Sequence, residues 1–393
     1  MNISHFETIW KLRKMQYRKL GRLGTKVSAL GFGCMRLPAE ETGGKIKRDE
    51  AIRLLRKGID NGINYMDTAW TYHGGESEVV LGLALKEGYR EKVTLVTKCP
   101  VGRSEFTKPE HYDEHLDEQL GRLNEDYLDF YLFHALNKKS YEEKVLGLDL
   151  VERAMKAKDE GKIRHLGFSF HDTPEVLKEI VDSGHFDLML VQYNIVDQVN
   201  HEMINYAGKK GLAVAIMGPV GGGRLAGKDV ADELKQWLSP GRTNFADLAF
   251  KFVLSNPNVS VALSGMGSEE MLEDNLNITS RDDYDKMTER EKESIEGIAA
   301  RFKELCDNIC TQCKYCQPCP NEVNISTIFA ELQRFQIYGD RESAKRYYSL
   351  IGKVPWAPGK DATACVECGE CLEKCPQNIE IIEQLKKAHE VLS

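Results

Sequence analysis

Short apolar runs alternate with longer segments of helical period from about Ala29 to Asn277. The runs are rich in Val, Ile, Leu and Phe, and this alternation is typical of repeated βα units. We predict eight strands: Ala29–Gly33, Ile63–Thr68, Val93–Lys98, Tyr127–His134, Ile163–Ser169, Leu188–Tyr193, Leu212–Met217 and Ser260–Ser264. Because eight parallel strands close a barrel, the pattern predicts an α/β fold of the (β/α)8 TIM-barrel type.

The segments between these strands begin with polar residues or proline, as helices do. They predict helices such as Arg48–Asn61, Pro109–Leu123, Pro174–Ser183 and Asn244–Ser255. A doubly wound open sheet is the alternative, but no Gly-x-Gly-x-x-Gly follows the first strand to support it. Before that strand, Tyr17–Ser28 predicts a hairpin with Gly21 and Gly24 near its turn. Such a hairpin can plug the bottom of the barrel.

The pattern changes after Asp283. A charged helical stretch over Lys286–Leu305 leads into sequence rich in Cys and Pro, and a helix is predicted over Ile325–Leu350 between two cysteine runs. We therefore predict an N-terminal extension over residues 1–15, a barrel over residues 16–290 and a mainly helical domain over residues 291–393.

Length and charge agree with two globular domains. The 393 residues suffice for a barrel of about 250 residues and a domain of roughly 100. A net charge of -8 argues against a nucleic-acid partner, which would need a basic face. The chain has no run of about 18 apolar residues, and its N-terminus lacks the apolar segment of a signal peptide. We expect no membrane partner and a cytoplasmic location.

Cysteine is concentrated near the C-terminus, where nine of the eleven cysteines lie between Cys306 and Cys375. Disulfide frameworks belong mostly to small secreted domains, so metal ligation is the better interpretation. The cysteines form two runs of nearly equal spacing, Cys310-x2-Cys313-x2-Cys316-x2-Cys319-Pro320 and Cys365-x2-Cys368-x2-Cys371-x3-Cys375-Pro376.

Two-residue gaps let three thiolates of one loop face a single [4Fe-4S] cluster, and in two-cluster ferredoxins the cysteine before proline ligates the other cluster. We predict two [4Fe-4S] clusters in a ferredoxin-like domain, one held by Cys310, Cys313, Cys316 and Cys375 and the other by Cys319, Cys365, Cys368 and Cys371. The first run departs from the usual pattern, because only two residues precede its last cysteine. Cys306 is either a helix residue or a spare ligand.

A pair of four-cysteine zinc sites is the alternative, since paired two-residue spacings occur there too. The Cys-Pro that closes each run favours iron–sulfur clusters, and the lack of histidine among these cysteines argues against a Rieske centre. Cys34 and Cys99 lie at predicted strand ends in the barrel. We expect them to be packed or free thiols.

Polar residues that close barrel strands deserve scrutiny, because TIM-barrel chemistry takes place at the C-terminal face. Asp67 ends the second strand, Tyr72 follows it by a short loop, and Lys98 and His134 end the third and fourth. Here the sequence resembles the aldo-keto reductases, whose Asp, Tyr, Lys and His tetrad occurs in these contexts. The resemblance covers roughly residues 16–280 and includes Gly-Gly-Glu-Ser-Glu after Tyr72, Gly161-Lys162-Ile163-Arg164-x-x-Gly167-x-Ser169, Val191-Gln192-Tyr193-Asn194 and Asn256-Pro257.

The resemblance implies reduction of a carbonyl by hydride, which places negative charge on an oxygen that must be protonated. Tyr72 is then the acid. A free phenol has a pKa near 10, and an adjacent Lys98 ammonium would favour its ionised form. Asp67 would hold that lysine, and His134 would orient the carbonyl oxygen.

For the cofactor, the resemblance implies that Ser169 and Gln192 bind a nicotinamide carboxamide, although Phe170 and His171 replace the usual asparagine after the serine. The glycine-rich loop after the seventh strand, residues 218–225, offers backbone N–H groups and one cation to a pyrophosphate. Its candidate residues are Gly218, Gly222 and Arg224.

The segment after the eighth strand, residues 264–275, matches the family's adenosine-binding segment, with Asn275 the clearest match. Gly265 and Met271 stand where NADP-preferring relatives carry Lys and Arg, and Glu269 and Glu270 are added. The cofactor is therefore NADP or NAD, with a flavin as an alternative that could convert two-electron to one-electron transfer.

Three functional hypotheses follow. The favoured one is a catalytic barrel that acts on a small organic substrate and uses its clusters to pass electrons, with a redox protein as a further partner. The second is an electron-transfer protein whose barrel is a scaffold in a larger complex. In the third, the clusters only stabilise the C-terminal segment.

Overall fold

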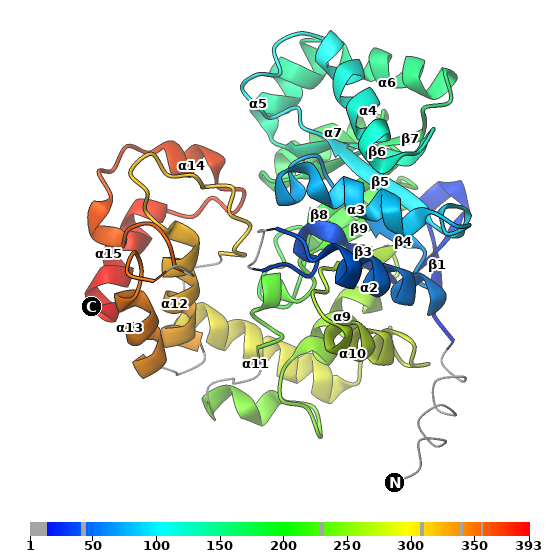
Figure 1. The fold of residues 1–393 in the computed structure, drawn as a ribbon. Coiled ribbons are helices and arrows are strands. Elements are labelled where there is room, and N and C mark those ends of the chain that lie inside the picture. Colours follow the sequence, from blue (N-terminus) through cyan, green and yellow to red (C-terminus); the bar gives the residue numbers. More distant parts are fainter. Residues whose placement is uncertain (1–13, 41–44, 228–231, 307–309, 338–340, 355–356) are drawn as a thin grey trace. The chain divides into compact units, whose positions relative to one another are not determined.

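Eight parallel strands close a barrel in the order β10-β3-β4-β5-β6-β7-β8-β9 (Figure 1). The pairing of β10 with β3 completes the ring, which confirms the predicted barrel and excludes the open sheet. Each strand lies within two residues of its predicted bounds: β3 Leu30–Gly33, β4 Tyr65–Asp67, β5 Thr94–Cys99, β6 Leu128–Leu136, β7 Ile163–Phe170, β8 Leu188–Gln192, β9 Ala213–Met217 and β10 Val261–Ser264.

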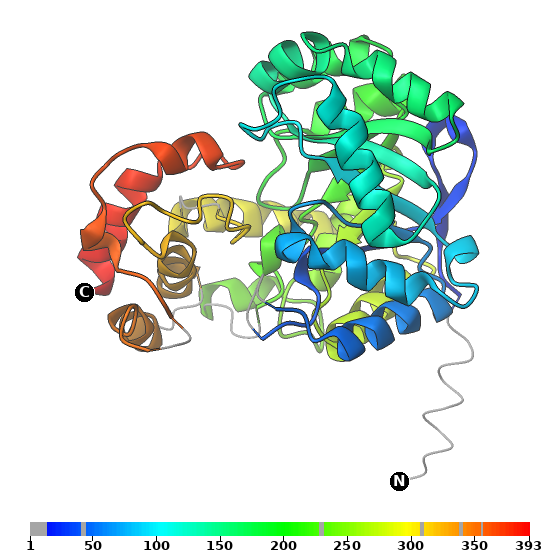
Figure 2. The same ribbon diagram turned by 45° about the horizontal axis from the view of Figure 1, so that its top comes forward.

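Helices surround these strands, as Figure 2 shows. The first, α2 (Arg48–Asp60), buries Ala51, Leu54, Leu55 and Ile59, which share one helical face. The others are α3 Glu76–Leu85, α4 Glu110–Leu123, α5 Lys138–Ser140, α6 Leu150–Asp159, α7 Pro174–Asp182, α8 His201–Lys209, α9 Ala246–Ser255 and α10 Glu269–Thr279. The four helices predicted by name are thus α2, α4, α7 and α9.

The predicted hairpin consists of β1 (Tyr17–Lys19) and β2 (Lys26–Ser28). Its Leu20 and Val27 are buried in one apolar cluster with inward-facing residues of the barrel strands. The Arg22 N–H donates to the Gly211 carbonyl, just before β9, so the hairpin closes the N-terminal end of the barrel. A Cβ on Gly21 would lie 2.4 Å from that carbonyl oxygen, so only glycine fits there.

The computed structural model describes residues 14–40, 45–227, 232–306, 310–337, 341–354 and 357–393. They divide into two compact units. The first comprises Met1–Tyr193, Asp197–Pro219 and Phe250–Met287, and it contains the barrel strands. The second comprises Asn194–Val196, Val220–Ala249 and Thr288–Ser393. Within the described ranges, no helix has the length and apolar character needed to cross a membrane.

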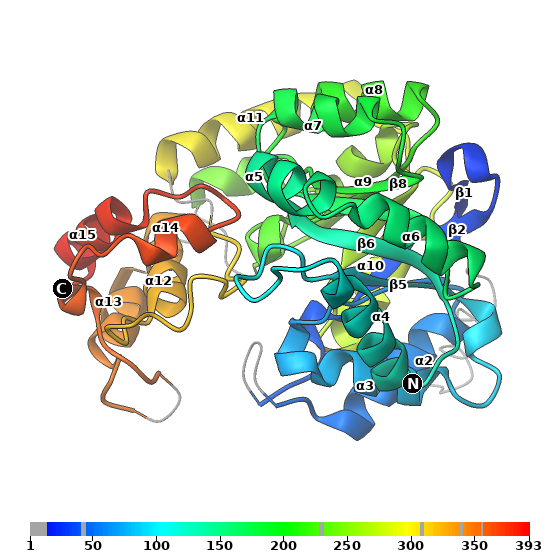
Figure 3. The ribbon, with the colours of Figure 1, turned by 90° about the horizontal axis from the view of Figure 1, so that it is seen from above.

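The second unit is built around α11 (Glu289–Leu305), α12 (Ile325–Ile337), α13 (Arg341–Ser349) and α15 (Ile381–Leu392), with the short α14 (Glu370–Lys374). Helices α12, α13 and α15 pack on one another around a single apolar core (Figure 3). The stretch predicted as one helix over Ile325–Leu350 is therefore two helices, and the prediction was wrong there. Residues 338–340 lie outside the described residues, and their sequence includes Gly339, a poor helix former.

The segment between β9 and α9 packs within the second unit. The 3-10 helix over Asp232–Trp237 lies against α11, where a Cβ on Gly297 would stand 2.5 Å from the Trp237 ring. The loop that continues from a barrel strand thereby becomes part of the unit that carries the cysteine runs.

Candidate active site and cysteine sites

The four predicted tetrad residues come together at the C-terminal ends of adjacent strands. Asp67 ends β4, Lys98 lies on β5 and His134 on β6, and all three are buried. Tyr72 begins the 3-10 turn Tyr72–Gly75 that follows β4. Because β4, β5 and β6 are neighbours in the barrel, Asp67 and His134 share one site although they are far apart along the chain.

Lys98 is the centre of this group. Its Nζ donates to Asp67 Oδ1 at 2.6 Å, to the Thr68 carbonyl at 2.6 Å and to the Tyr72 hydroxyl oxygen at 3.4 Å. The Tyr72 and His134 rings meet edge to face with centroids 6.1 Å apart. The ammonium therefore links a buried carboxylate to a phenol, and an imidazole stands beside that phenol.

Burial dominates the electrostatics of the site. It raises the pKa of Asp67, and the Lys98 ammonium acts in the opposite direction. The pKa of His134 is lowered well below its usual value, by burial first and then by the positive charge of Lys98. His134 is therefore neutral at physiological pH and can serve as a hydrogen-bond donor or acceptor through one ring nitrogen each.

A β-bulge beside His134 fixes its position. The register of β6 against β7 shifts between Phe133 and Leu136, and Ala135 has a φ of 53°, which is unusual for a residue with a Cβ. The Ala135 N–H donates to Ser169 Oγ at 2.7 Å. Ser169, a predicted cofactor residue, thus also holds the bulge, and its own hydroxyl proton is left to donate elsewhere.

A buried carboxylate lies behind Lys98 and was not singled out from the sequence, although it belongs to the Gly-Gly-Glu-Ser-Glu segment. Glu78 Oε1 accepts from Thr97 Oγ1 at 2.6 Å and Gln119 Nε2 at 2.5 Å, and Glu78 Oε2 pairs with Arg122 at 3.2 Å. Gln119 Nε2 also donates to the Lys98 carbonyl at 3.2 Å. This network ties the backbone of β5 at Lys98 to α3 and α4.

The predicted nicotinamide residues occupy the ends of β7 and β8. Ser169 and Gln192 are both buried, and the Gln192 amide donates to Asp197 Oδ2 at 2.5 Å. Gly218 follows β9 with a φ of 63°, and a Cβ there would stand 3.6 Å from Gln192 Oε1. A buried hydroxyl and a fixed amide at neighbouring strand ends are the donor and acceptor types that suit a carboxamide.

The predicted adenosine segment starts helix α10. Asn275 is buried and its Nδ2 donates to Ser264 Oγ at 3.0 Å. Glu269 is paired with Lys57 of α2, at 2.6 Å, and the same lysine contacts Glu273 at 2.9 Å. Lys57 therefore partly neutralises the acidic charge that the sequence adds here.

Gly222 and Arg224, the other predicted cofactor residues, lie in the second unit, where Gly222 packs against the first cysteine run. A Cβ on Gly222 would stand 3.0 Å from Thr311, the residue after Cys310. Ser169, Gln192, Gly218 and Asn275 all belong to the first unit. The structure thus groups four of the six predicted cofactor residues with the tetrad and two with the cysteines.

Cys310, Cys313, Cys316 and Cys375, which the spacing predicts as the ligands of one cluster, line one pocket. Burial raises the pKa of Cys310 to about 12, a backbone N–H bond from Gln312 lowers it, and the Cys313 and Cys375 thiols raise it further. Residues 310–316 and Cys375 are thereby brought together from opposite ends of the domain.

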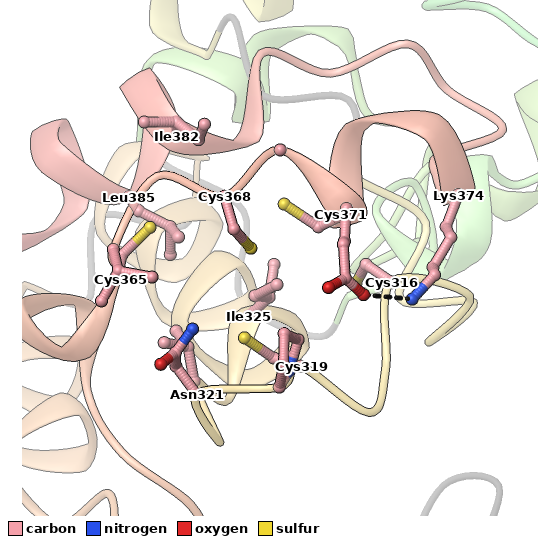
Figure 4. A pocket seen from close by; sticks show the side chains of 15 residues that line it. Cys316, Cys319, Asn321, Ile325, Cys365, Cys368, Cys371, Lys374, Ile382 and Leu385 are labelled. Carbon is pink, nitrogen blue, oxygen red and sulfur yellow. Dashed lines mark hydrogen bonds and ion pairs between the residues drawn. The ribbon is translucent and has the colours of Figure 1, made fainter.

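The second group of predicted ligands lines a second pocket. Figure 4 shows the sulfur atoms of Cys319, Cys365, Cys368 and Cys371 turned toward one space. Cys316 touches this cavity as well, but its thiol interacts electrostatically with Cys310, Cys313 and Cys375 of the first group. Cys306 caps the end of α11 and lines neither cavity.

The donor set fits iron–sulfur clusters better than single ions. Zinc needs its thiolates about 2.3 Å from one point. Within the described residues, no three His, Cys, Asp or Glu side chains are placed to hold one metal ion. The thiols instead line two pockets in groups of four, and four thiolates are the donor set that a [4Fe-4S] cluster takes. Cys34 and Cys99 are buried free thiols in the barrel, as expected from the sequence.

The fold and the site together define a barrel oxidoreductase whose second unit carries two groups of cysteines. Comparison with known proteins agrees with this assignment. Residues 29–295 match the Aldo/keto reductase family, and residues 309–380 match a 4Fe-4S dicluster domain. The chain belongs to the aldo/keto reductase family.

Relatives and solved structures cover the barrel. L-galactose dehydrogenase of Arabidopsis thaliana is 28% identical over 75% of this chain and 97% of its own length. NADH-specific methylglyoxal reductase of Escherichia coli is 27% identical over 65% of this chain and 89% of its own length. An aldo-keto reductase of Bacillus halodurans, in its holo form, superposes with a TM-score of 0.62 at 26% identity, covering 73% of this chain and 97% of that one.

Proposed function

We propose that this protein catalyses nicotinamide-linked interconversion of a small carbonyl compound and its alcohol, with Tyr72 as general acid and base. The observation that supports this most is the set of bonds at Lys98, whose Nζ meets both the Asp67 carboxylate and the Tyr72 hydroxyl. A positive charge beside a phenol favours phenolate, so the phenol gives up its proton more readily.

The bound nicotinamide would supply or accept a hydride. Tyr72 then gives a proton to the carbonyl oxygen, or takes it from the alcohol. Neutral His134 donates a hydrogen bond to the same oxygen and orients it. Asp67 compensates the charge of Lys98 in a buried place, which keeps the ammonium fixed at the phenol.

For the cofactor we propose NADH in preference to NADPH. Ser169 and Gln192 would hold its carboxamide, and Asn275 its adenosine. Gly265 offers no side chain, and Lys57 is engaged by Glu269 and Glu273. A 2′-phosphate would therefore find two carboxylates and an already paired lysine, whereas a ribose hydroxyl carries no charge. The relative from Escherichia coli is named NADH-specific, which agrees with this choice.

For the second unit we propose two [4Fe-4S] clusters, held by the two cysteine groups. Clusters carry single electrons, and we propose that they exchange these with a redox-protein partner. The exposed Cys368 places one ligand of the second group at the surface. A flavin has no support from a particular contact and is not part of this proposal.

Turnover of the Tyr72→Phe variant tests the catalytic proposal. Removing the hydroxyl should lower kcat by about 10²–10⁴-fold with a small aldehyde and NADH, because general acid catalysis is lost. Tyr127→Phe is the matched control, since Tyr127 lies at the opposite end of β6 and its ring faces Arg90 and Arg164. Wild-type turnover in Tyr72→Phe would contradict the proposal and favour an electron-transfer protein.

A further inference from the structure

The loop that carries Tyr72 has a strained backbone. The three residues after Tyr72 are His73, Gly74 and Gly75, and their φ values are 50°, 64° and 92°. Glycine adopts this left-handed region readily, but it is unfavourable for His73, which has a Cβ. Such a conformation persists only where the surrounding structure holds it. The position of the Tyr72 hydroxyl therefore depends on contacts that keep the loop in this shape.

Arg122, on helix α4, contacts this loop on both sides of Tyr72. Before Tyr72, the Arg122 Nη1 donates to the Trp70 carbonyl at 3.3 Å. After Tyr72, the same guanidinium lies against Gly75, where a Cβ would stand only 2.6 Å from Nη1. Gly75 thus leaves room for the guanidinium beside the backbone. One side chain therefore bridges the two flanks of Tyr72.

Two carboxylates hold the guanidinium in this place. Arg122 Nη1 pairs with Glu78 Oε2 at 3.2 Å, and Nη2 donates to Glu118 Oε1 at 2.5 Å. Glu118 also accepts from Trp70 Nε1 at 3.0 Å, and the Trp70 ring faces the guanidinium at 5.1 Å. A planar fork with five N–H donors can make these contacts together, whereas the single nitrogen of a lysine cannot reach all of them.

The base of the loop is held without Arg122. The Thr68 carbonyl accepts from Lys98 Nζ at 2.6 Å, and Thr68 Oγ1 lies 2.9 Å from Ser77 Oγ. Ser77 Oγ in turn donates to the Cys34 carbonyl at 2.9 Å. Loss of Arg122 should therefore leave Lys98 and the ends of the loop in place and release its middle, which carries Tyr72.

We propose that Arg122 is a positioning residue for Tyr72, which keeps the Tyr72 hydroxyl within reach of Lys98 Nζ by holding residues 70–75. This inference rests on the proposed function of Tyr72 as general acid and base. The distance between the hydroxyl oxygen and Nζ is 3.4 Å, close to the upper limit of a hydrogen bond. A small displacement of the loop is thus enough to separate the phenol from the ammonium. Arg122 acts through Tyr72 and takes no part in the proton transfer.

A double-mutant cycle tests this inference in turnover of propanal with NADH. Arg122→Gln should lower kcat by about tenfold or more, because a small displacement of a catalytic group slows the reaction strongly, and should leave the Kd of NADH unchanged. In Tyr72→Phe, the same substitution should lower kcat by less than about twofold, since no hydroxyl is left to position. Arg122→Lys should have an intermediate kcat.

Arg90→Gln is the matched control for a general loss of stability. Arg90 is a buried arginine just before β5, at the opposite end of the barrel from Tyr72, and it pairs with Glu125 at 3.3 Å and Asp129 at 3.0 Å. Its substitution should lower the free energy of unfolding and leave kcat within about twofold of wild type. A loss of kcat in Arg90→Gln equal to that in Arg122→Gln would overturn the positioning role.

Amide hydrogen exchange of the full chain gives a second readout that needs no turnover. Residues 69–77 should exchange at least about tenfold faster in Arg122→Gln than in wild type, and at the wild-type rate in Arg90→Gln. Wild-type exchange in Arg122→Gln, or a tenfold loss of kcat that persists in Tyr72→Phe, would overturn this inference alone. If Arg122→Gln does not fold, Arg122→Lys provides the same comparison, and wild-type exchange in it would overturn the inference. Wild-type turnover in Tyr72→Phe would instead overturn the proposed function.

Discussion

The tetrad and the cysteine sites are held in place by different means. Lys98 is surrounded by partners that the chain itself supplies, namely Asp67, Thr68 and Tyr72, and the Glu78 network supports its strand from behind. The cysteines instead lie on two loops and on the short helix α14, which pack against the apolar core of α12, α13 and α15. The function proposed for these cysteines requires bound iron–sulfur clusters, which the chain does not itself supply.

This difference determines which amino-acid substitutions each site tolerates. In the barrel, a substitution leaves a buried charge or polar group without its partner, which is costly. In the cysteine domain, helices define the shape, and a lost thiol removes a ligand and leaves the apolar core intact. Substitutions in the barrel should therefore affect stability, whereas those in the cysteine domain should affect metal content.

The largest expected effect is loss of a whole cluster in Cys313→Ser. Cys313 lines only the cavity of the first group, so iron should fall from about eight to about four per chain. Cys306→Ser is the matched control and should keep all its iron, because Cys306 lines neither cavity. Iron and acid-labile sulfide analysis compares the metal content of the two variants. A loss of iron in Cys306→Ser would show that Cys306 is a ligand.

Next in size is the destabilisation of Glu78→Gln. An amide cannot compensate Arg122 or accept all three of its buried bonds, so the free energy of unfolding should fall by about 3 kcal/mol. Glu118 is the other carboxylate that pairs with Arg122, and its side chain is about half exposed. Glu118→Gln should therefore lower the free energy of unfolding by less than about 1 kcal/mol. Urea unfolding compares the two variants. Equal losses would show that Glu78 is no more important than a surface ion pair.

The smallest effect is a change in pH dependence in His134→Gln. Burial holds the pKa of His134 below that of the unfolded chain, so its contribution to stability is present above about pH 6.5 and is lost as the pH falls. The loss should reach up to about 1.4 kcal/mol per pH unit. The difference between the unfolding free energies of wild type and His134→Gln, measured between pH 5.5 and 7.5, isolates the pH-dependent contribution of His134. A difference that does not change with pH would contradict a neutral buried imidazole.

Local patterns in the sequence were sufficient for most of the fold. Buried strands are continuous apolar runs, so their bounds could be predicted within two residues, and β7 and β8 begin as predicted. The assignment of the cysteines to two clusters stays a prediction from their spacing, and the structure shows that the four cysteines of each predicted group line one pocket. The split between α12 and α13 could not be seen, since apolar residues continue at helical spacing into α13.

Local sequence patterns could not predict contacts between residues that lie far apart in the chain. Nothing local to Glu78 shows that Gln119 and Arg122 will meet it, and nothing near Ala135 predicts a bulge. The position of Arg224 is the clearest case, because glycine next to a cation suits a phosphate as well as a cysteine loop. In the structure, Gly222 packs against Thr311, the residue after Cys310.

The measurement that tests the central claim most directly is iron and acid-labile sulfide analysis of the anaerobically purified protein, followed by a visible spectrum. We predict about eight irons and about eight sulfides per chain, with a charge-transfer absorbance in that spectrum. Zinc without sulfide would contradict the assignment of both cysteine groups.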